Sequence, residues 1–178
     1  MPIYGVTPDA TTSSKGKIQL AGHLAGTAAS PTIAWTYNPY SFRAYDSGGT
    51  TLTDNAFVQI NLATEDYDYN SNFTASAYTA PVAGVYNFSG CVTHATVSVT
   101  PVLAISAIFV DAVQKMNGTA AIASAATNTS AFAVAGDLLL AAGAVVTLRH
   151  FQNSNGNEAS ATNTYDTWFS GHLVHRTA

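Results

Sequence analysis

The sequence is poor in charge. Only 9% of its 178 residues are Asp, Glu, Lys or Arg, where ordinary soluble domains carry about 25%. The six basic residues are scattered and form no stripe, which argues against a nucleic-acid partner. Because 47% of the residues are hydrophobic, the chain is not a disordered tail either. A surface with so few charges is covered with neutral side chains or buried in an oligomer, and the composition fits both.

Cysteines and long apolar runs are also scarce. Cys91 is the sole cysteine, so no disulfide forms within the chain, and its apolar surroundings indicate a small buried thiol rather than a nucleophile.

The most apolar window, residues 131–148, is broken by Asp137 and two glycines, which predicts no membrane insertion. The first 17 residues carry no apolar run behind basic residues, so we expect no secretory signal. Common enzyme motifs are absent, and we expect no cofactor.

The first 39 residues differ in kind from the rest. They are small and polar, with recurrent glycine and proline and only isolated large apolar side chains. No helical or strand period persists there, which predicts an extended arm lying against a larger partner. We therefore divide the chain into an anchoring arm, residues 1–39, and a head domain, residues 40–178.

The head has the pattern of an all-β sandwich or barrel, because short alternating segments are separated by turn signals. Residues 84–94 place Tyr86 and Phe88 on the face opposite Cys91, and residues 167–175 place Phe169 and Leu173 opposite Trp168. Residues 65–72 are predicted to form a turn, Asn117–Gly118 a hairpin turn, and residues 119–131 a loop or irregular strand.

The segment 103–113 is apolar on both faces and contains Ile105 and Phe109. In an antiparallel sandwich this pattern indicates a strand covered by its own core on one side and by a neighbouring subunit on the other.

Two segments of the head have a distinctive pattern. Residues 78–89, YTAPVAGVYNFS, read aromatic-Thr-x-Pro-Val-x-Gly-Val-Tyr-x-Phe-Ser, and residues 168–174 contain Phe-Ser-Gly-x-Leu. In these segments the head resembles the globular domain of the complement C1q and tumour-necrosis-factor superfamily, which has the first pattern as a signature and the second in its closing strand. Two departures are Ala144, where many members have Asp, and the absence of a collagen-like stalk. The resemblance implies a ten-stranded jelly roll that assembles as a homotrimer. We assign these residues to the trimer interface or core: Ile105, Phe109, Tyr86, Phe88, Trp168, Phe169 and Leu173.

The arm has a resemblance of its own. Residues 13–33 are similar to a Lys-Gly-x-Ile-x-Leu-Ala-Gly segment found in the head or tail fibres of tailed bacteriophages, with His23 in place of a more usual Asp. The resemblance implies that the arm docks on other virion proteins, capsid or tail, while the head projects. The residues that would anchor it are Lys15, Gly16, Ile18, Leu20, Gly22, Leu24 and Pro31.

Two groups of residues have the donor atoms of a metal site. Asp66, Asp68 and Asn70 offer hard oxygens for Ca²⁺, but the EF-hand glycine and closing Glu are missing, so a solvated turn is favoured. His172 and His175 are predicted on opposite faces of one strand and so cannot chelate together. One histidine from each of three subunits, His172 or His94, would form a site on a three-fold axis, although hydrogen bonding at an interface or rim is favoured. His94 and His150 are expected at strand ends on the sheet rim.

Three functions follow from different features. The leading one is a non-enzymatic virion structural protein, a trimeric fibre or decoration protein. The second is an adhesin of the same fold that binds a host glycan or protein through loop residues; Tyr37, Tyr40, Tyr67, Tyr69 and Tyr165 can stack on sugars, although most tyrosines in jelly rolls lie in cores or interfaces. The third is a hydrolase on a β scaffold, which needs an acid–base pair that no adjacent residues supply.

Overall fold

The computed structural model describes residues 24–27, 30–33, 38–96, 102–118, 121–123 and 130–177. The chain divides into two units, Met1–Asn38 and Pro39–Ala178. In the first unit, β1 (Leu24–Thr27) pairs antiparallel with β2 (Ser30–Ile33). This hairpin differs from the fully extended arm that the sequence predicts, because Leu24 pairs with Ile33 and the chain folds back on itself.

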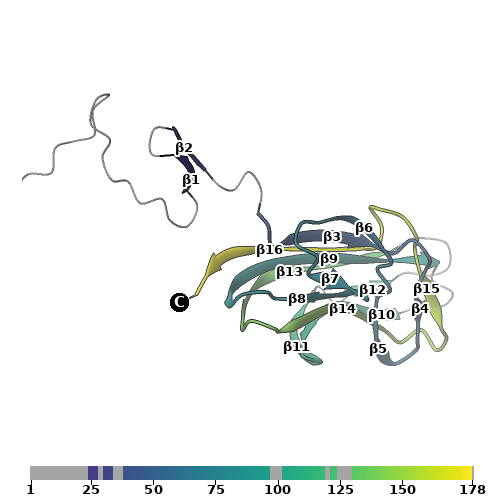
Figure 1. Ribbon diagram of the computed structural model, residues 1–178. Coiled ribbons are helices and arrows are strands. Elements are labelled where there is room, and N and C mark those ends of the chain that lie inside the picture. Colours follow the sequence, from purple (N-terminus) through teal and green to yellow (C-terminus); the bar gives the residue numbers. More distant parts are fainter. Residues whose placement is uncertain are drawn as a thin grey trace, which may run out of the picture. The chain divides into compact units, whose positions relative to one another are not determined.

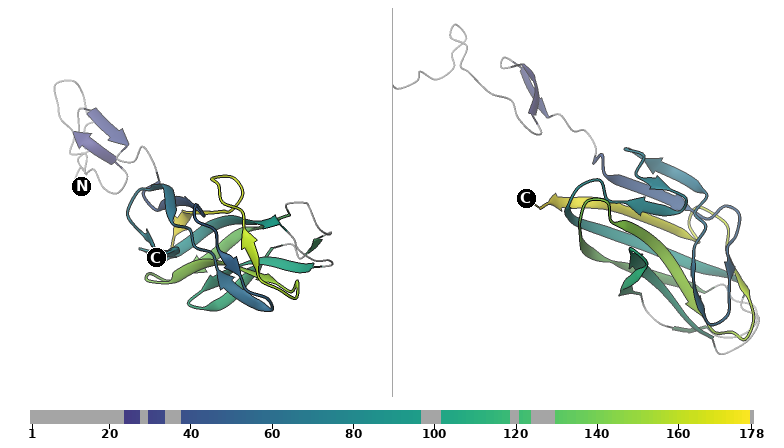
Figure 2. Two further views of the ribbon diagram at one scale, coloured as in Figure 1. Left: turned by 90° about the vertical axis from the view of Figure 1, so that its right-hand side faces the viewer. Right: turned by 60° about the horizontal axis from the view of Figure 1, so that its bottom comes forward.

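The second unit is a sandwich of two antiparallel sheets, seen edge-on in Figure 1 and from two further sides in Figure 2. The first sheet has the order β4-β15-β9-β16-β3-β6, with β13 also paired to β9. Its strands are β3 (Ser41–Tyr45), β4 (Thr51–Leu52), β6 (Thr64–Asp68), β9 (Gly84–Thr96), β13 (Ala131–Leu140), β15 (Glu158–Ser160) and β16 (Trp168–Arg176).

The second sheet has the order β11-β10-β14-β8-β7, with β12 also paired to β10. Its strands are β7 (Phe73–Thr74), β8 (Ala77–Thr79), β10 (Val102–Val110), β11 (Val113–Asn117), β12 (Ala121–Ala123) and β14 (Val145–Gln152). A further strand, β5 (Ala56–Gln59), lies beside β14, and just after it the Ile60 N–H donates to the Leu148 carbonyl at 3.1 Å. The described residues contain no helix, so the predicted all-β sandwich is confirmed.

Aromatic side chains fill the space between the sheets. Phe42 of β3 stacks on Tyr78 of β8 with ring centroids 4.7 Å apart, and Phe88 of β9 stacks on Phe169 of β16 at 5.7 Å. All four are fully buried. The alternation in β9 and β16 is therefore confirmed, because the side chains predicted to share a face do point into the core.

One glycine is needed for this packing. A Cβ on Gly171 of β16 would lie 2.5 Å from the Phe88 ring and 2.9 Å from the Phe42 ring. Both rings lie against the bare strand backbone, so any side chain at residue 171 would push them apart.

Two predicted turns differ from the structure, and the first, at Asn117–Gly118, is wrong. Lys115, Met116 and Asn117 belong to β11, and the hairpin between β10 and β11 turns at Asp111 and Ala112, which have φ angles of 49° and 64°. Positive φ costs Ala about 1–2 kcal/mol. The turn also packs against β14, where Asp111 Oδ1 accepts the Val145 N–H at 2.9 Å and the Asp111 N–H donates to the Val145 carbonyl at 2.9 Å.

The second turn, predicted for the segment 65–72, is only half right. Its first half forms β6, which pairs with β3 at the edge of the first sheet, and the chain turns only from Tyr69 onward. Strand pairing thus overrides the high polarity of this segment. Of the segment 119–131, residues 121–123 form β12 and Ala131 begins β13; residues 119–120 and 124–129 lie outside the described residues.

Candidate interaction surfaces

The outward face of the first sheet carries small side chains. Directly paired residues of antiparallel strands share a face, and the register aligns Ala135, Ser89, Ser170 and Arg43 in one row across β13, β9, β16 and β3. We name the part on β13, β9 and β16 the small-residue face. Its members are Val85, Asn87, Ser89, Cys91, Ala131, Ala133, Ala135, Asp137, Leu139, Trp168, Ser170, His172 and His175, most of them small or uncharged.

The small-residue face is accessible and nearly uncharged. In β13, Ala131, Ala133 and Ala135 are exposed, while the alternate residues Phe132 and Val134 are buried in the sandwich. The Asp137 carboxylate accepts a hydrogen bond from the Asn87 amide at 2.7 Å. Leu139, near the C-terminal end of β13 on the same face, is 70% exposed. This face therefore has the composition of a surface that a second protein chain can cover without desolvating many charges.

Part of the outward face of the second sheet is covered by the chain itself, although Leu103 and Val145 on that face are 37% and 38% exposed. Phe109 of β10 is only 8% exposed because the Phe57 ring packs against it at 5.2 Å and the Arg149 guanidinium lies 4.6 Å above it. The prediction that a neighbouring subunit covers Phe109 is therefore not needed. Ile105 on the same face is half-buried.

The other predicted interface or core residues divide into two groups. Tyr86, Phe88, Phe169 and Leu173 all belong to the core of the sandwich. Trp168 faces outward from the sheet and is half-buried, with the Arg43 guanidinium 5.4 Å from its ring.

The prediction for the two C-terminal histidines is wrong. A bulge in β16 at Val174 shifts the register, so that His172 pairs with Asn87 and His175 pairs with Val85. Because Asn87 and Val85 are two residues apart on β9, both histidines lie on the same face of the sheet. Both are exposed.

Three exposed tyrosines lie at the β6 side of the first sheet. Tyr67 and Tyr69 stack with ring centroids 5.2 Å apart and are 37% and 52% exposed, and Tyr165, on the loop before β16, is 75% exposed. We name these three residues the tyrosine patch. Tyr40, another predicted sugar-stacking residue, is half-buried beneath the Arg176 guanidinium, 5.2 Å from its ring. Tyr37 lies outside the described residues.

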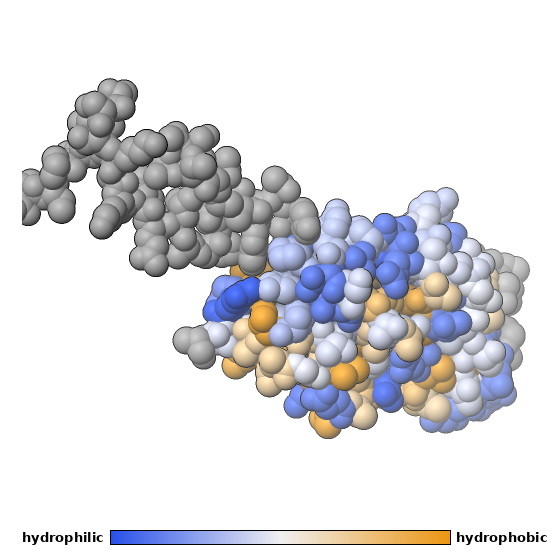
Figure 3. All heavy atoms as spheres, in the orientation of Figure 1, coloured by the Kyte–Doolittle hydropathy of each residue, from blue (hydrophilic) through white to orange (hydrophobic). Residues whose placement is uncertain are grey.

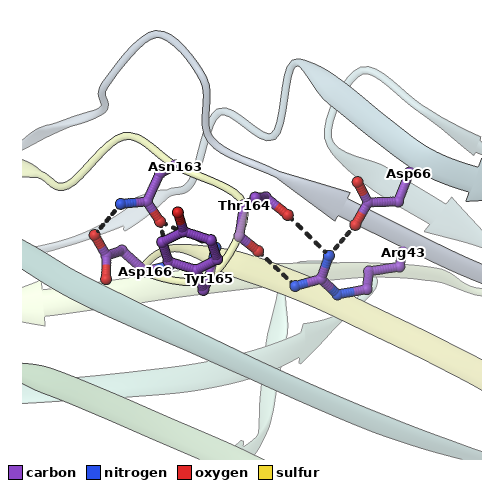
Figure 4. A network of polar contacts seen from close by, with 6 residues as sticks. All are labelled: Arg43, Asp66, Asn163, Thr164, Tyr165 and Asp166. Carbon is purple, nitrogen blue, oxygen red and sulfur yellow. Dashed lines mark hydrogen bonds and ion pairs between the residues drawn. The ribbon is translucent and has the colours of Figure 1, made fainter.

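Arg43 connects the two parts of the tyrosine patch (Figure 4). Its guanidinium forms an ion pair with Asp66 of β6, the neighbour of Tyr67. The same group donates to the Thr164 carbonyl at 2.5 Å and to the Thr164 hydroxyl at 3.3 Å, next to Tyr165. One side chain thus holds the strand and the loop that carry the tyrosines.

The loop that carries Tyr165 is held by its own side chains. Asn163 Oδ1 accepts the backbone N–H groups of Tyr165 at 3.0 Å and of Asp166 at 2.8 Å, and the Asn163 amide donates to the Asp166 carboxylate. The Asp166 carbonyl in turn accepts a hydrogen bond from the Thr93 hydroxyl of β9 at 2.7 Å. Tyr165 therefore projects from a loop that is tied to the sheet.

The calcium candidates have partners of their own. Asp66 pairs with Arg43, and Asp68 Oδ2 accepts the Phe73 N–H at 2.8 Å. Asn70 lies in the turn that follows β6. In the part of the chain that the structure describes, no group of three or more His, Cys, Asp or Glu side chains is placed to hold a metal ion.

A buried pair of histidines joins the two sheets. His94 of β9 and His150 of β14 are fully buried, and their Nε2 atoms lie 2.8 Å apart. The Ser106 hydroxyl of β10 lies 3.0 Å from His150 Nδ1 and donates to the Phe132 carbonyl at 2.7 Å. The two histidines lie near strand ends, as expected, but inside the sandwich rather than on its rim. Sequence reasoning missed the pair because its members are 56 residues apart.

Burial controls the protonation of this pair. It lowers the pKa of His94, against the opposing effect of Glu158, and it lowers the pKa of His150 to about 3, with the proximity of His94 acting in the same direction. Both rings are thus neutral near pH 7. Ser106 is also fully buried, so this serine–histidine cluster offers no substrate access, and His94 is not available to a site on a three-fold axis.

Cys91 lies on the small-residue face. It is half-buried, its Sγ is 4.0 Å from the Thr93 hydroxyl, and burial raises the pKa of its thiol. A raised pKa lowers the thiolate fraction, in line with the prediction that this residue is not a nucleophile.

Of the predicted anchoring residues, Leu24 and Pro31 belong to the β1–β2 hairpin, where Gly26 pairs with Pro31. The other anchoring residues lie outside the described residues: Lys15, Gly16, Ile18, Leu20 and Gly22.

Within the described ranges no helix is long and apolar enough to cross a membrane. The head surface in Figure 3 is mostly pale, with separate hydrophilic and hydrophobic groups, in line with the low charge of the chain.

Comparisons with known proteins give different results for the two parts of the chain. Residues 8–37 match a family described as a repeat of unknown function, DUF5907. No curated protein matches the chain.

Solved structures match the head. The globular domain of the zebrafish complement 1qA protein is 17% identical with a TM-score of 0.57, and the match covers 78% of this chain and 99% of that chain. The Eiger TNF of S. frugiperda is 9% identical with a TM-score of 0.60, covering 80% and 96%. Murine APRIL, in its crystal structure at pH 8.0, is 11% identical with a TM-score of 0.55, covering 76% and 98%. At these identities the likeness shows the fold alone, and the head has the jelly-roll fold of C1q and TNF domains.

Proposed function

We propose that this chain is a non-enzymatic structural protein of a tailed-bacteriophage virion, a homotrimeric fibre or decoration protein. In this proposal the arm, residues 1–39, binds other virion proteins of the capsid or tail, and the jelly-roll head projects outward. The small-residue face is the observation that carries the trimer, because its alanines are exposed although the rest of the sandwich is well packed. The resemblance of the head to C1q and TNF domains supports a three-fold assembly.

The virion role rests on the arm. Its resemblance to fibre segments of tailed phages supports docking on a particle, and the match of residues 8–37 to a repeat is compatible with a segment reused in several proteins. Small side chains and recurrent glycine permit close approach of the backbone to a partner surface.

Electron microscopy of intact particles tests the virion role. Gold-labelled antibodies against the head are expected to decorate capsids or tails of the wild-type particle. A phage that carries Leu20→Asp and Leu24→Asp in the arm is expected to lose this label, whereas one that carries Val113→Ala, a change on the exposed surface of the head, is expected to keep it. Particles without label in all three cases would overturn the proposal.

A second candidate is an adhesin of the same fold. The tyrosine patch favours an adhesin, because exposed aromatic rings on a backbone fixed by hydrogen bonds are a common feature of binding surfaces. Binding of the purified protein to host cells, and its loss when Tyr67 and Tyr69 are changed to Ala, would support this function. A protein that binds no host envelope would support decoration alone.

A further inference from the structure

We propose that the tyrosine patch is a binding surface for a neutral, hexose-based polysaccharide. This inference deepens the adhesin candidate and rests on it. It uses the three exposed tyrosines, the Arg43 network that joins them, and the charges of the residues around them.

The exposed aromatic residues of the head gather in this one region. Among the described large hydrophobic side chains that are exposed, the aromatic ones are Tyr67, Tyr69 and Tyr165, and the rest are aliphatic. The other large aromatic rings of the core and of the second sheet pack against one another. A tyrosine presents an apolar ring and a hydroxyl together, which suits the C–H face and the hydroxyls of a hexose.

The patch is organised before any ligand arrives. Tyr67 lies on β6, which is paired to β3, and its ring is held by stacking on Tyr69 at 5.2 Å. Tyr165 follows Thr164, whose carbonyl and hydroxyl are bound by Arg43, and its N–H is bound by the Asn163 side chain at 3.0 Å. Backbone ordered in advance lowers the entropic cost of binding, which matters for a weak ligand such as a sugar chain.

The charges around the patch select a neutral ligand. The Arg43 cation that joins the patch is neutralised by Asp66, and the Asp166 carboxylate lies on the same loop as Tyr165 (Figure 4). Glu65, next to Asp66, is exposed. The local balance is therefore acidic, so sulfated, phosphorylated or carboxylated glycans would meet repulsion. The hydroxyls of Tyr67 and Tyr165 are polar groups suited to sugar hydroxyls.

Titration of the full-length protein with defined oligosaccharides tests the proposal. The probes are maltohexaose, cellohexaose, mannohexaose and galactohexaose as neutral chains, and a heparin hexasaccharide and a sialylated hexasaccharide as charged ones. Saturation-transfer NMR and calorimetry are expected to show binding of at least one neutral chain. Raising the salt from 50 to 500 mM is expected to change its affinity less than two-fold, because a neutral ligand brings no charge for the salt to screen.

Single variants connect the binding to the patch. Tyr67→Ala and Tyr165→Ala are each expected to weaken it at least ten-fold, and Tyr165→Phe is expected to retain it within three-fold because the ring remains. Val113→Ala, a matched exposed site on β11 of the other sheet, is expected to leave it unchanged. Circular dichroism checks that each variant is folded.

Several outcomes would overturn the proposal. The first two are the absence of binding to any neutral probe and binding to the charged probes alone. The third is binding of a neutral probe that is unchanged in both the Tyr67→Ala and the Tyr165→Ala variants. The fourth is attachment to host cells that protease treatment of the cells abolishes, while the neutral glycans do not bind. Each of these would leave the trimer and the virion location standing, because those are measured by mass and by electron microscopy.

Discussion

The outward faces of the two sheets differ in how their side chains are covered. On the second sheet, Phe109 points outward but is covered by Phe57 and Arg149 of the same chain. On the first sheet, the small-residue face has exposed Ala133, Ala135 and Leu139, and nothing in the described part of the chain covers them. The Phe109 ring is thus covered within a single chain, whereas the small-residue face is suited to contact with another chain.

The largest effect is expected from charges on the small-residue face. The double variant Ala133→Arg with Ala135→Arg places two cations where subunits would meet, and like charges brought together in a desolvated interface cost several kcal/mol. Both residues are exposed in the single chain, so the fold should persist while the trimer dissociates. Light scattering measures the mass and circular dichroism the fold. As a control, Val113→Arg on the other sheet should remain trimeric, and a trimeric double variant would contradict the account.

The second prediction compares the two faces within the monomer. In the double-variant background, Phe109→Ala should lower the free energy of unfolding by about 3 kcal/mol, because it removes a covered aromatic ring. Leu139→Ala should change it by less than about 0.5 kcal/mol, because Leu139 is 70% exposed. Urea denaturation gives both values. Equal losses at the two positions would show that the faces do not differ as described.

The third prediction concerns acid. The pKa values of His94 and His150 lie below their ordinary value in the folded chain, so the unfolded chain binds more protons below about pH 6.5. Stability is therefore fully present above that pH and falls as the pH decreases toward the folded pKa of His150, about 3. Between pH 7 and pH 5 the loss from His150 is about 2 kcal/mol.

Urea denaturation of the monomeric double variant at the two pH values tests this loss. Replacement of the exposed His175 by Ala should leave the loss unchanged, whereas replacement of His150 by Gln, which can still hydrogen-bond, should remove most of it. An acid loss that is independent of His150 would rule out the buried pair as its cause.

The smallest effect uses Cys91 as a reporter of coverage. This half-buried thiol lies on the small-residue face, so a neighbouring subunit would shield it. Labelling by an aromatic disulfide reagent should be about ten-fold slower in the native protein than in the monomeric double variant, equivalent to about 1.4 kcal/mol of protection. Equal labelling rates would mean that no chain covers this face.

The sequence predicts the sandwich and the inward side chains of β9 and β16, because alternation and a long signature segment are local properties. It does not predict contacts that depend on register. The bulge at Val174 brings His172 and His175 to one face, and only packing of the two sheets brings His94 to His150. The hairpin turns at Asp111 and Ala112 rather than at Asn117–Gly118 because contacts between the turn and Val145 outweigh local turn preference.

The sequence predicts the candidate surfaces only in part. The sequence indicates Tyr67, Tyr69 and Tyr165 as sugar-stacking candidates, but the Arg43 bridge that joins them spans 121 residues to Thr164. The sequence does not locate the small-residue face. It indicates the segment 103–113 instead, where Phe109 is covered on its outer side by Phe57 and Arg149. The residues that cover Phe109 belong to strands distant in sequence, so no local pattern in the sequence indicates the contact.

The mass of the unmodified protein in solution tests the central claim most directly. Sedimentation equilibrium at micromolar concentration and physiological salt is expected to give three times the mass of the chain, with no monomer over a ten-fold dilution. A single species with the mass of one chain would contradict the account, because the small-residue face would then be open to water in the working form of the protein.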